Sequence, residues 1–166
     1  MNHKLDYLIG NDVLCKHSCE ISSSEMKFYP EDHFPFHDEI ESVPIRRMAT
    51  LPVIKVEMNG EIVDMFFDTG AKISYVAPHL LRCEKERTEG ELAQDFHPSI
   101  GAFTTTVYKT EMTVGSKTFN ITCGTLPESL SYMVSMMPGV KGIIGSEVLD
   151  QCQGLFIASD CLFFLE

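Results

Sequence analysis

The strongest constraint on the fold is a hairpin pattern between residues 52 and 67. Polar and apolar residues alternate along Pro52–Met58, so that the even-numbered residues from Ile54 onward share one face of a strand. Asn59-Gly60 follows directly, and these residues tolerate the positive φ angles that a type I′ turn requires. The return segment, Glu61–Phe67, ends in an apolar run typical of a strand buried on both faces. The chain is therefore expected to contain antiparallel β-structure.

Later segments continue this pattern with little helix. A second hairpin is predicted from Tyr108 to Cys123 with its turn at Gly115-Ser116, and a final hairpin from Leu155 to Leu165. Residues 146–152 fit one or two helical turns, with Ser146 as the N-cap. These patterns predict a mainly β fold with one or two short helices.

An internal repeat relates the two ends of the chain. Tyr7–Leu14 matches Gly142–Leu149 without a gap at an offset of 135 (145 − 10), and weaker similarity continues to residue 29. Residues 7–29 and 142–164 are therefore predicted to form the same unit, which is a strand end, a short helix and a hairpin. The stretch between them is not repeated, so the chain contains one complete unit and the tail of another.

Residues 30–50 differ from the rest in composition. They are acidic and are interrupted by three prolines, which indicates a linker or surface arm. The predicted divisions are a repeat-tail segment (1–29), this linker (30–50) and a complete β-domain (51–166). His33 and His37 are separated by a proline that prevents a regular helix from aligning their rings. Cys15-Lys-His-Ser-Cys19 lacks a second Cys/His pair, so no metal site is predicted.

Charge and hydropathy exclude several classes of partner. The net charge of −11 argues against nucleic-acid binding, which needs a basic surface. No apolar run approaches the roughly 20 residues of a membrane span, so no membrane partner is expected. The first residues lack the pattern of a secretory signal, which favours a cytoplasmic location without fixing the compartment. The six cysteines are interpreted as thiols, partly buried, rather than as a disulfide framework.

Asp68-Thr69-Gly70 directly follows the apolar end of a predicted strand. Alone, this tripeptide also fits an ordinary strand-end turn, in which Asp bonds nearby backbone groups and Gly supplies a positive φ. A second element, Gly142-Ile-Ile-Gly145, begins 72 residues after Gly70 (142 − 70), with hairpins between. The order and spacing of the two elements favour a rigidly held carboxylate at a surface or interface.

The two elements together resemble a known family. Phe66–Ala71 resembles the active-site loop of the retropepsins, the retroviral-type aspartic proteases. Ile143-Ile144-Gly145, followed by Val148-Leu149, resembles the family's second signature. Ser99–Phe103 lies where the family has its flap hairpin, although it contains fewer glycines than retroviral flaps. The resemblance covers Leu51 to Leu165.

This resemblance implies a retropepsin- or pepsin-type acid protease lobe with a closed, barrel-like sheet. It implies an aspartic endopeptidase that acts on protein or peptide substrates without a cofactor. Asp68 would be the catalytic carboxylate, with Thr69 bracing the site across an interface and Gly70 allowing close backbone approach. A lobe supplies one aspartate and the chemistry needs two, so a homodimer is implied. The residues expected to contact substrate are Ala71, Ile100, Gly101 and Ala102, the last three near the tip of a flap hairpin predicted at Phe96–Tyr108.

The first fifty residues depart from the family pattern and leave two alternatives open. The chain could be a catalytically silent lobe that serves as a dimerisation or peptide-binding module. It could also be the C-terminal fragment of a bilobal aspartic protease. A further hypothesis is self-cleavage at Tyr29-Pro30 or Phe34-Pro35, because retropepsins accept aromatic–Pro bonds and exposed, flexible segments are where cleavage concentrates.

Overall fold

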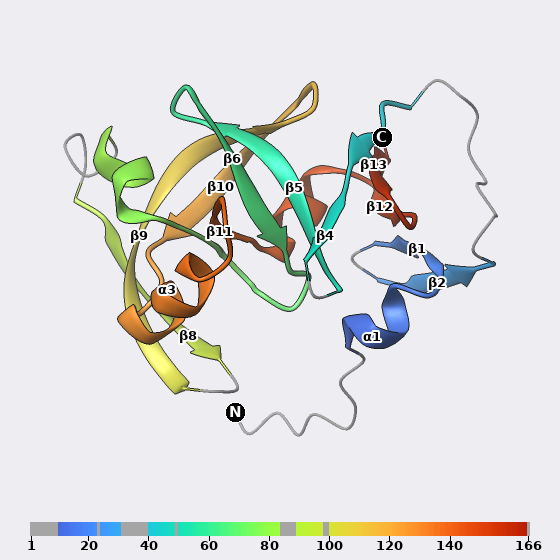
Figure 1. The fold of residues 1–166 in the computed structure, drawn as a ribbon. Helices are drawn as coiled ribbons and strands as arrows, with labels where there is room; N and C mark the ends of the chain where they lie inside the picture. Colours follow the sequence, from blue (N-terminus) through green and yellow to red (C-terminus); the bar gives the residue numbers. More distant parts are fainter. Residues whose placement is uncertain are drawn as a thin grey trace.

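Two β-sheets make up most of the computed structural model, which describes residues 10–22, 24–30, 40–48, 50–83, 89–97 and 100–165 (Figure 1). The larger sheet contains β4 (Arg46–Met48), β5 (Leu51–Met58), β6 (Glu61–Phe67), β7 (Ser74–Val76), β8 (Glu91–His97), β9 (Gly101–Val114), β10 (Lys117–Gly124) and β11 (Val140–Ile144). The smaller sheet contains β1 (Ser18–Ile21), β2 (Met26–Tyr29), β3 (Val43–Pro44), β12 (Gly154–Ile157) and β13 (Cys161–Leu165). The helical elements are α1 (Asn11–Leu14), η1 (Pro78–Leu81), α3 (Glu128–Ser135) and η2 (Ser146–Gln151).

The hairpin of β5 and β6 forms as the sequence predicts. The turn has φ angles of 52° at Asn59 and 79° at Gly60, both in the left-handed region that a type I′ turn needs. On β5, the predicted inward face is almost completely buried, with Ile54, Val56 and Met58 each 1% exposed. The end of β6 is buried on both faces, which carries the chain into the protein interior immediately before Asp68.

The larger sheet closes into a barrel of six strands. Its order is β4-β5-β6-β11-β7-β10-β9-β8, and an additional pairing of β5 with β9 joins Glu57 to Thr113 and closes the ring. Side chains that point inward, among them Met65, Met112 and Phe119, are fully buried. The predicted mainly β fold is confirmed. Among the described residues, no helix is long and apolar enough to cross a bilayer.

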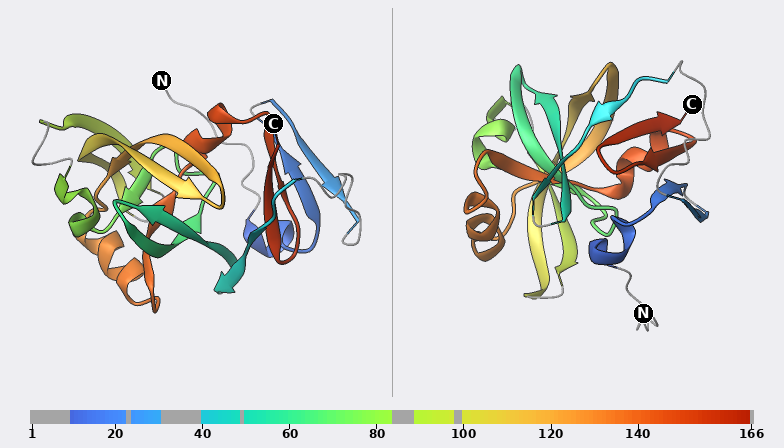
Figure 2. Two further views of the ribbon diagram at one scale, coloured as in Figure 1. Left: turned by 90° about the horizontal axis from the view of Figure 1, so that it is seen from above. Right: turned by 45° about the vertical axis from the view of Figure 1, so that its right-hand side comes forward.

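The smaller sheet joins the two ends of the chain. Its order is β2-β1-β12-β13-β3, so that the N-terminal hairpin β1–β2 lies beside the C-terminal hairpin β12–β13 (Figure 2). Each hairpin follows a short helix, α1 or η2. The helices begin 135 positions apart (146 − 11), whereas the first hairpin strands, β1 and β12, begin 136 apart (154 − 18). The pairing within the hairpins keeps this offset of 136, because Ile21 pairs with Met26 and Ile157 pairs with Leu162. The repeat therefore gains one residue between helix and hairpin, which the ungapped alignment does not anticipate. Its first positions, Tyr7 to Ile9, lie outside the described residues.

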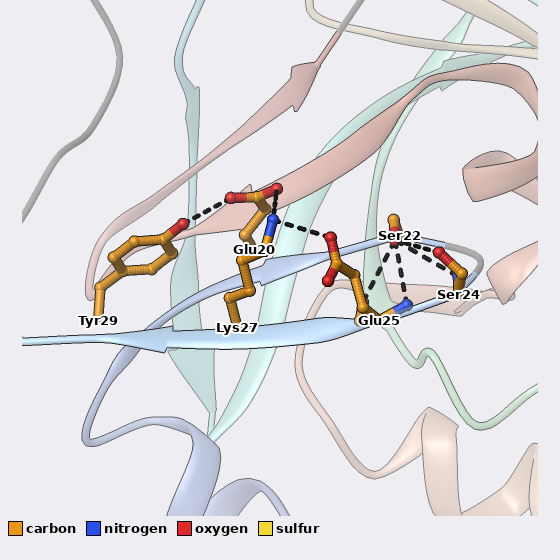
Figure 3. A network of polar contacts seen from close by, with 6 residues as sticks. All are labelled: Glu20, Ser22, Ser24, Glu25, Lys27 and Tyr29. Carbon is orange, nitrogen blue, oxygen red and sulfur yellow. Dashed lines mark hydrogen bonds and ion pairs between the residues drawn. The ribbon is translucent and has the colours of Figure 1, made fainter.

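A polar network links the two strands of the N-terminal hairpin (Figure 3). The Tyr29 hydroxyl donates a hydrogen bond of 2.7 Å to Glu20, and Lys27 forms ion pairs with Glu20 and Glu25. In the turn, the Glu25 amide donates to the Ser22 hydroxyl at 3.2 Å. These contacts stay within residues 20–29, so they stabilise the hairpin itself rather than its attachment to the rest of the protein.

Two local expectations need correction. Part of the segment interpreted as a linker is structured, because β3 pairs with β13 and β4 pairs with β5. Residues 31–39, with His33, His37 and the Phe34-Pro35 bond, lie outside the described residues. The predicted N-cap at Ser146 is wrong: Gly145 occupies the N-cap position of η2, and no side chain caps this helix.

Candidate active site

The loop that follows β6 presents a carboxylate at the protein surface. Asp68 is exposed although the three residues before it are buried. Its backbone N–H donates to the carbonyl of Ile144 at 2.9 Å, which continues the parallel pairing of β6 with β11. The Gly70 amide donates to Asp68 Oδ1 at 2.9 Å, and a Cβ at position 70 would lie 3.1 Å from the same oxygen. The carboxylate is thus oriented by backbone rather than by a mobile side chain.

The segment that starts η2 supports this loop from behind. The backbone N–H and the hydroxyl of Ser146 both donate to the Ala71 carbonyl, at 2.7 and 3.0 Å. A Cβ at Gly145 would lie 2.6 Å from the Ile73 carbonyl oxygen and 3.0 Å from that of Ala71. Glycine at position 145 therefore permits the close packing of η2 on this loop. The Ser146 hydroxyl is used on this loop, which explains why it does not cap the helix.

Glu147 connects η2 to two barrel strands. Its carboxylate accepts hydrogen bonds from the amide and hydroxyl of Ser74 at 3.0 and 2.9 Å, and from the Thr122 amide at 2.7 Å. The Ser74 hydroxyl in turn accepts from the Gly145 amide at 3.1 Å. Burial raises the pKa of Glu147, and the three donors oppose this shift without cancelling it. The loop at Asp68 therefore rests on a hydrogen-bonded base that includes a partly buried acid.

Strands β8 and β9 form a long hairpin that ends between His97 and Gly101. The hairpin begins at Glu91, earlier than the predicted Phe96, because β8 pairs with β9 over its full length. Gly101 has a φ of 79°, and Ile100 and Ala102 are exposed beside it. The three residues expected at the flap tip thus lie at the end of this hairpin.

A buried tyrosine attaches this hairpin to the barrel. The Tyr75 hydroxyl, on β7, donates a short hydrogen bond to Asp95 on β8, and its ring packs 6.0 Å from that of Phe103 on β9. Burial and the Asp95 carboxylate together raise the pKa of Tyr75, so that it remains a hydrogen-bond donor at neutral pH. This hydrogen bond therefore joins β8 to β7 two residues before β8 ends at His97.

A largely apolar cleft of about 580 Å³ lies beside the Asp68 loop. The loop contributes Asp68, Thr69 and Gly70 to its lining, and the β8–β9 hairpin contributes His97. One wall comes from α3 and the segment that follows it, with Met133, Val134 and Met137. The opposite wall comes from the N-terminal segment, with Gly10, Leu14, Cys15, Cys19 and Ile21. The end of β8, through His97, and the Asp68 loop therefore border the same cleft.

Several of these lining residues were not expected from the sequence. Neither His97 nor the α3 wall was singled out, although Leu130, Val134 and Met137 recur at the spacing of one helix face. Conversely, Ala71, Ile100, Gly101 and Ala102 do not line the cleft. Ala71 instead supports the loop through its carbonyl. The substrate-contacting role of these four residues stays a prediction.

The barrel, the carboxylate loop and the glycine-supported helix start together define the fold of a retropepsin-like aspartic protease. No protein-family model matches the sequence, and neither does any curated protein. Among solved structures, the chain is similar to a crystal structure of a retropepsin-like aspartic protease from Rickettsia conorii, with a TM-score of 0.53 and 17% sequence identity. The superposition covers 76% of this chain and 91% of the other. At this level of identity, the likeness concerns the fold.

Proposed function

We propose that this chain is an aspartic endopeptidase that works as a homodimer, with Asp68 from each of two chains in one site. The observation that carries the proposal is the position of Asp68. Its carboxylate is exposed, accepts a hydrogen bond from the Gly70 amide, and lines a largely apolar cleft. The largely apolar lining would suit the side chains of a bound peptide, and the β8–β9 hairpin borders the same cleft through His97.

The chemistry requires two such carboxylates in contact. Like charges that touch cannot both be ionised, so the pair would share one proton. The ionised carboxylate takes a proton from a water molecule, which attacks the carbonyl carbon of the peptide bond. The protonated one donates a hydrogen bond to the carbonyl oxygen and then helps to protonate the leaving amine. Thr69 would brace the two loops across the interface, and the hairpin tip would exclude water from the bound peptide.

A single substitution tests the proposal. Asp68→Asn changes the side chain almost isosterically, so we expect a folded protein that has lost at least about a thousandfold in peptidase activity. The matched control is Asp150→Asn, because Asp150 is an exposed carboxylate outside the cleft lining. Specific activity of the wild type should rise with protein concentration, as a dimeric site requires. Undiminished cleavage by Asp68→Asn would exclude Asp68 as the catalyst.

One observation favours the alternative of a silent dimerisation or peptide-binding module. The strand β12, at the centre of the smaller sheet, is already paired on both sides within the chain. A lobe covered in this way could bind peptides without ever forming a pair of aspartates. Peptide binding by wild type and by Asp68→Asn with equal affinity, and without cleavage at any protein concentration, would support this second function. The same result would also be compatible with a fragment of a bilobal enzyme that needs its other lobe.

A further inference from the structure

The pairing of β1 with β12 follows a local two-fold axis. The two hairpins are offset by 136 positions, so Glu20 and Phe156 are counterparts (156 − 20), and they face each other directly. Exchanging every residue for its counterpart reproduces the same set of pairs, which are Cys19 with Ile157, Glu20 with Phe156, and Ile21 with Leu155. The hairpin β1–β2 therefore lies against β12–β13 as a second copy of β12–β13 would lie across a two-fold axis.

This arrangement leaves no room on β12 for a second chain. The strand is bonded to β1 on one side and to β13 on the other (Figure 2). A backbone edge can pair with one strand at a time, because each N–H and carbonyl of the ladder is already used. A second copy can reach the β12 edge only after β1 has left it.

The same axis relates the N-terminal segment to the candidate active site. In the complete lobe, Gly145 and Ser146 contact the Asp68 loop directly. Their counterparts in the repeat are Gly10 and Asn11, and Gly10 lines the same cleft as Asp68. A second copy placed over the N-terminal segment would have its Gly145 near the position of Gly10. Its Asp68 loop would then face the first one across the cleft.

We propose that residues 10–29 are an internal substitute for the second protomer, and that the surface they cover is the docking surface for another copy of this chain. The homodimer with its two Asp68 side chains forms when this segment leaves the β12 edge. This inference rests on the proposed function, since the second lobe is needed only to complete the site.

The chemistry of the covered edge fits a second copy better than the segment that now occupies it. β1 presents Cys19, Glu20 and Ile21 to β12, whereas a second copy would present its Leu155, Phe156 and Ile157. On the two-fold axis, the charged Glu20 would be replaced by Phe156 of the second copy, and Phe156 is 0% exposed in the present sheet. The polar network of Figure 3 stays inside the hairpin, so the attachment depends on the short β1 ladder, on the burial of Cys19 and Ile21 in the core, and on the contact of Tyr29 with Phe156 at 5.7 Å between ring centroids.

A reversible crosslink in the full chain tests whether the segment must leave. Cys19 is a buried thiol directly opposite Ile157, and residues that face each other across antiparallel strands have the Cα spacing of a disulfide. We expect oxidised Ile157→Cys to remain monomeric in sedimentation at every concentration and to lack peptidase activity. Reduction should raise dimer formation and activity together to the level of Cys19→Ser/Ile157→Cys, which carries the same change on β12. Cys19→Ser/Ile157→Cys is the control, and oxidant should not change its oligomeric state. Dimers of the crosslinked protein, or failure of the disulfide to form, would overturn the inference.

A second variant weakens the attachment without touching the interface of the expected dimer. Ile21 is 7% exposed in the docked hairpin and leaves the interface when the hairpin leaves. The apparent dissociation constant of the dimer depends on the fraction of open chains, so Ile21→Asp should lower it at least about tenfold relative to Ile21→Val. An unchanged constant, or a chain that stays monomeric in both variants, contradicts the inference. Dimers of Ile21→Asp that cut no peptide would instead leave the inference standing and refute the proposed function.

Discussion

Replacing Gly145 by alanine should destabilise the lobe through steric contacts with the backbone of Ile73 and Ala71. The backbone at Gly145 has φ −85° and ψ 176°, which alanine adopts without strain. The added Cβ, however, would meet the Ile73 carbonyl oxygen at 2.6 Å, and neither backbone segment is a flexible side-chain end that could turn aside. The substitution therefore isolates the close approach of η2 to the loop that carries Asp68.

The expected loss of stability follows from opposing contributions. Overpacking of this kind costs about 1–3 kcal/mol. If the loop moves away, the hydrogen bond of 2.7 Å from the Ser146 amide to Ala71 weakens, which adds about 1 kcal/mol. The reduced entropy of the unfolded chain returns about 0.4–1 kcal/mol in favour of alanine. The net result is a destabilisation of about 1–3 kcal/mol, and with a total stability of roughly 5–15 kcal/mol the variant still folds.

Urea denaturation measures this change. With a slope of about 2 kcal/mol per molar urea, a loss of 2 kcal/mol moves the midpoint down by about 1 M. Gly10→Ala is the matched control, because Gly10 is the repeat counterpart and is exposed; its midpoint should move by no more than the equivalent of about 0.5 kcal/mol. A Gly145→Ala protein as stable as the wild type, at an unchanged slope, would refute the reasoning that η2 packs tightly on the loop.

Two further predictions concern titration and processing. Because burial raises the folded-state pKa of Glu147 above its ordinary value of 4.5, its favourable contribution is complete below pH 4.5 and is lost as pH rises through the raised value. The stability of wild type relative to Glu147→Gln should therefore fall as urea midpoints are measured from pH 4 upward; a difference that grows with pH would mean that the hydrogen bonds outweigh burial. For self-cleavage at Tyr29-Pro30 or Phe34-Pro35, mass spectrometry of incubated wild type should find shortened chains that Asp68→Asn does not produce. Tyr29 is the last residue of β2, so the first bond should be cut only in chains whose hairpin end has left the sheet, and an intact chain under conditions where other peptides are cut would exclude the idea.

The hairpins could be predicted because their signals are local. Asn59-Gly60 specifies a turn by its own backbone preferences, and alternation on either side specifies which face is buried. The loop at Asp68 was found for a similar reason, since its motif lies in consecutive residues. The second signature, Ile143-Ile144-Gly145, begins 75 positions after Asp68 (143 − 68). It could be connected with the loop from the order of the elements along the chain.

The local signals for the helix α3 are weak, and its one periodic pattern was not recognised. Its N-cap position is Pro127, without a side-chain capping bond, and its sequence contains Ser, Tyr and Val, which are modest helix formers. Leu130 is 3% exposed, and Val134 packs against the cluster of Val53, Phe66 and Val140. Tertiary packing therefore contributes much of what decides the conformation of this segment, and that contribution cannot be read along the sequence.

The start of the β8–β9 hairpin at Glu91 was missed because β8 is largely exposed. β8 buries little, with Leu92 79% and Phe96 64% exposed, so it has no apolar alternation to reveal it. Its strand conformation comes from pairing with β9, and Asp95 also accepts a hydrogen bond from the Tyr75 hydroxyl on β7. A strand such as β8, which is stabilised mainly by pairing with β9, can be recognised only when the position of β9 is known.

The pairing of β1 with β12 also determines when the protein can finish folding during synthesis. β1 is synthesised well before β12: Ile157, which pairs with Cys19, is made 138 residues after it (157 − 19). At translation rates of about 5–20 residues per second, this interval lasts roughly 7–28 s. The amide of Asp68 likewise waits for the carbonyl of Ile144. Through that interval the first hairpin has an unpaired edge. Between the synthesis of Asp68 and that of Ile144, the nascent chain also carries an aspartate whose supporting strand is incomplete.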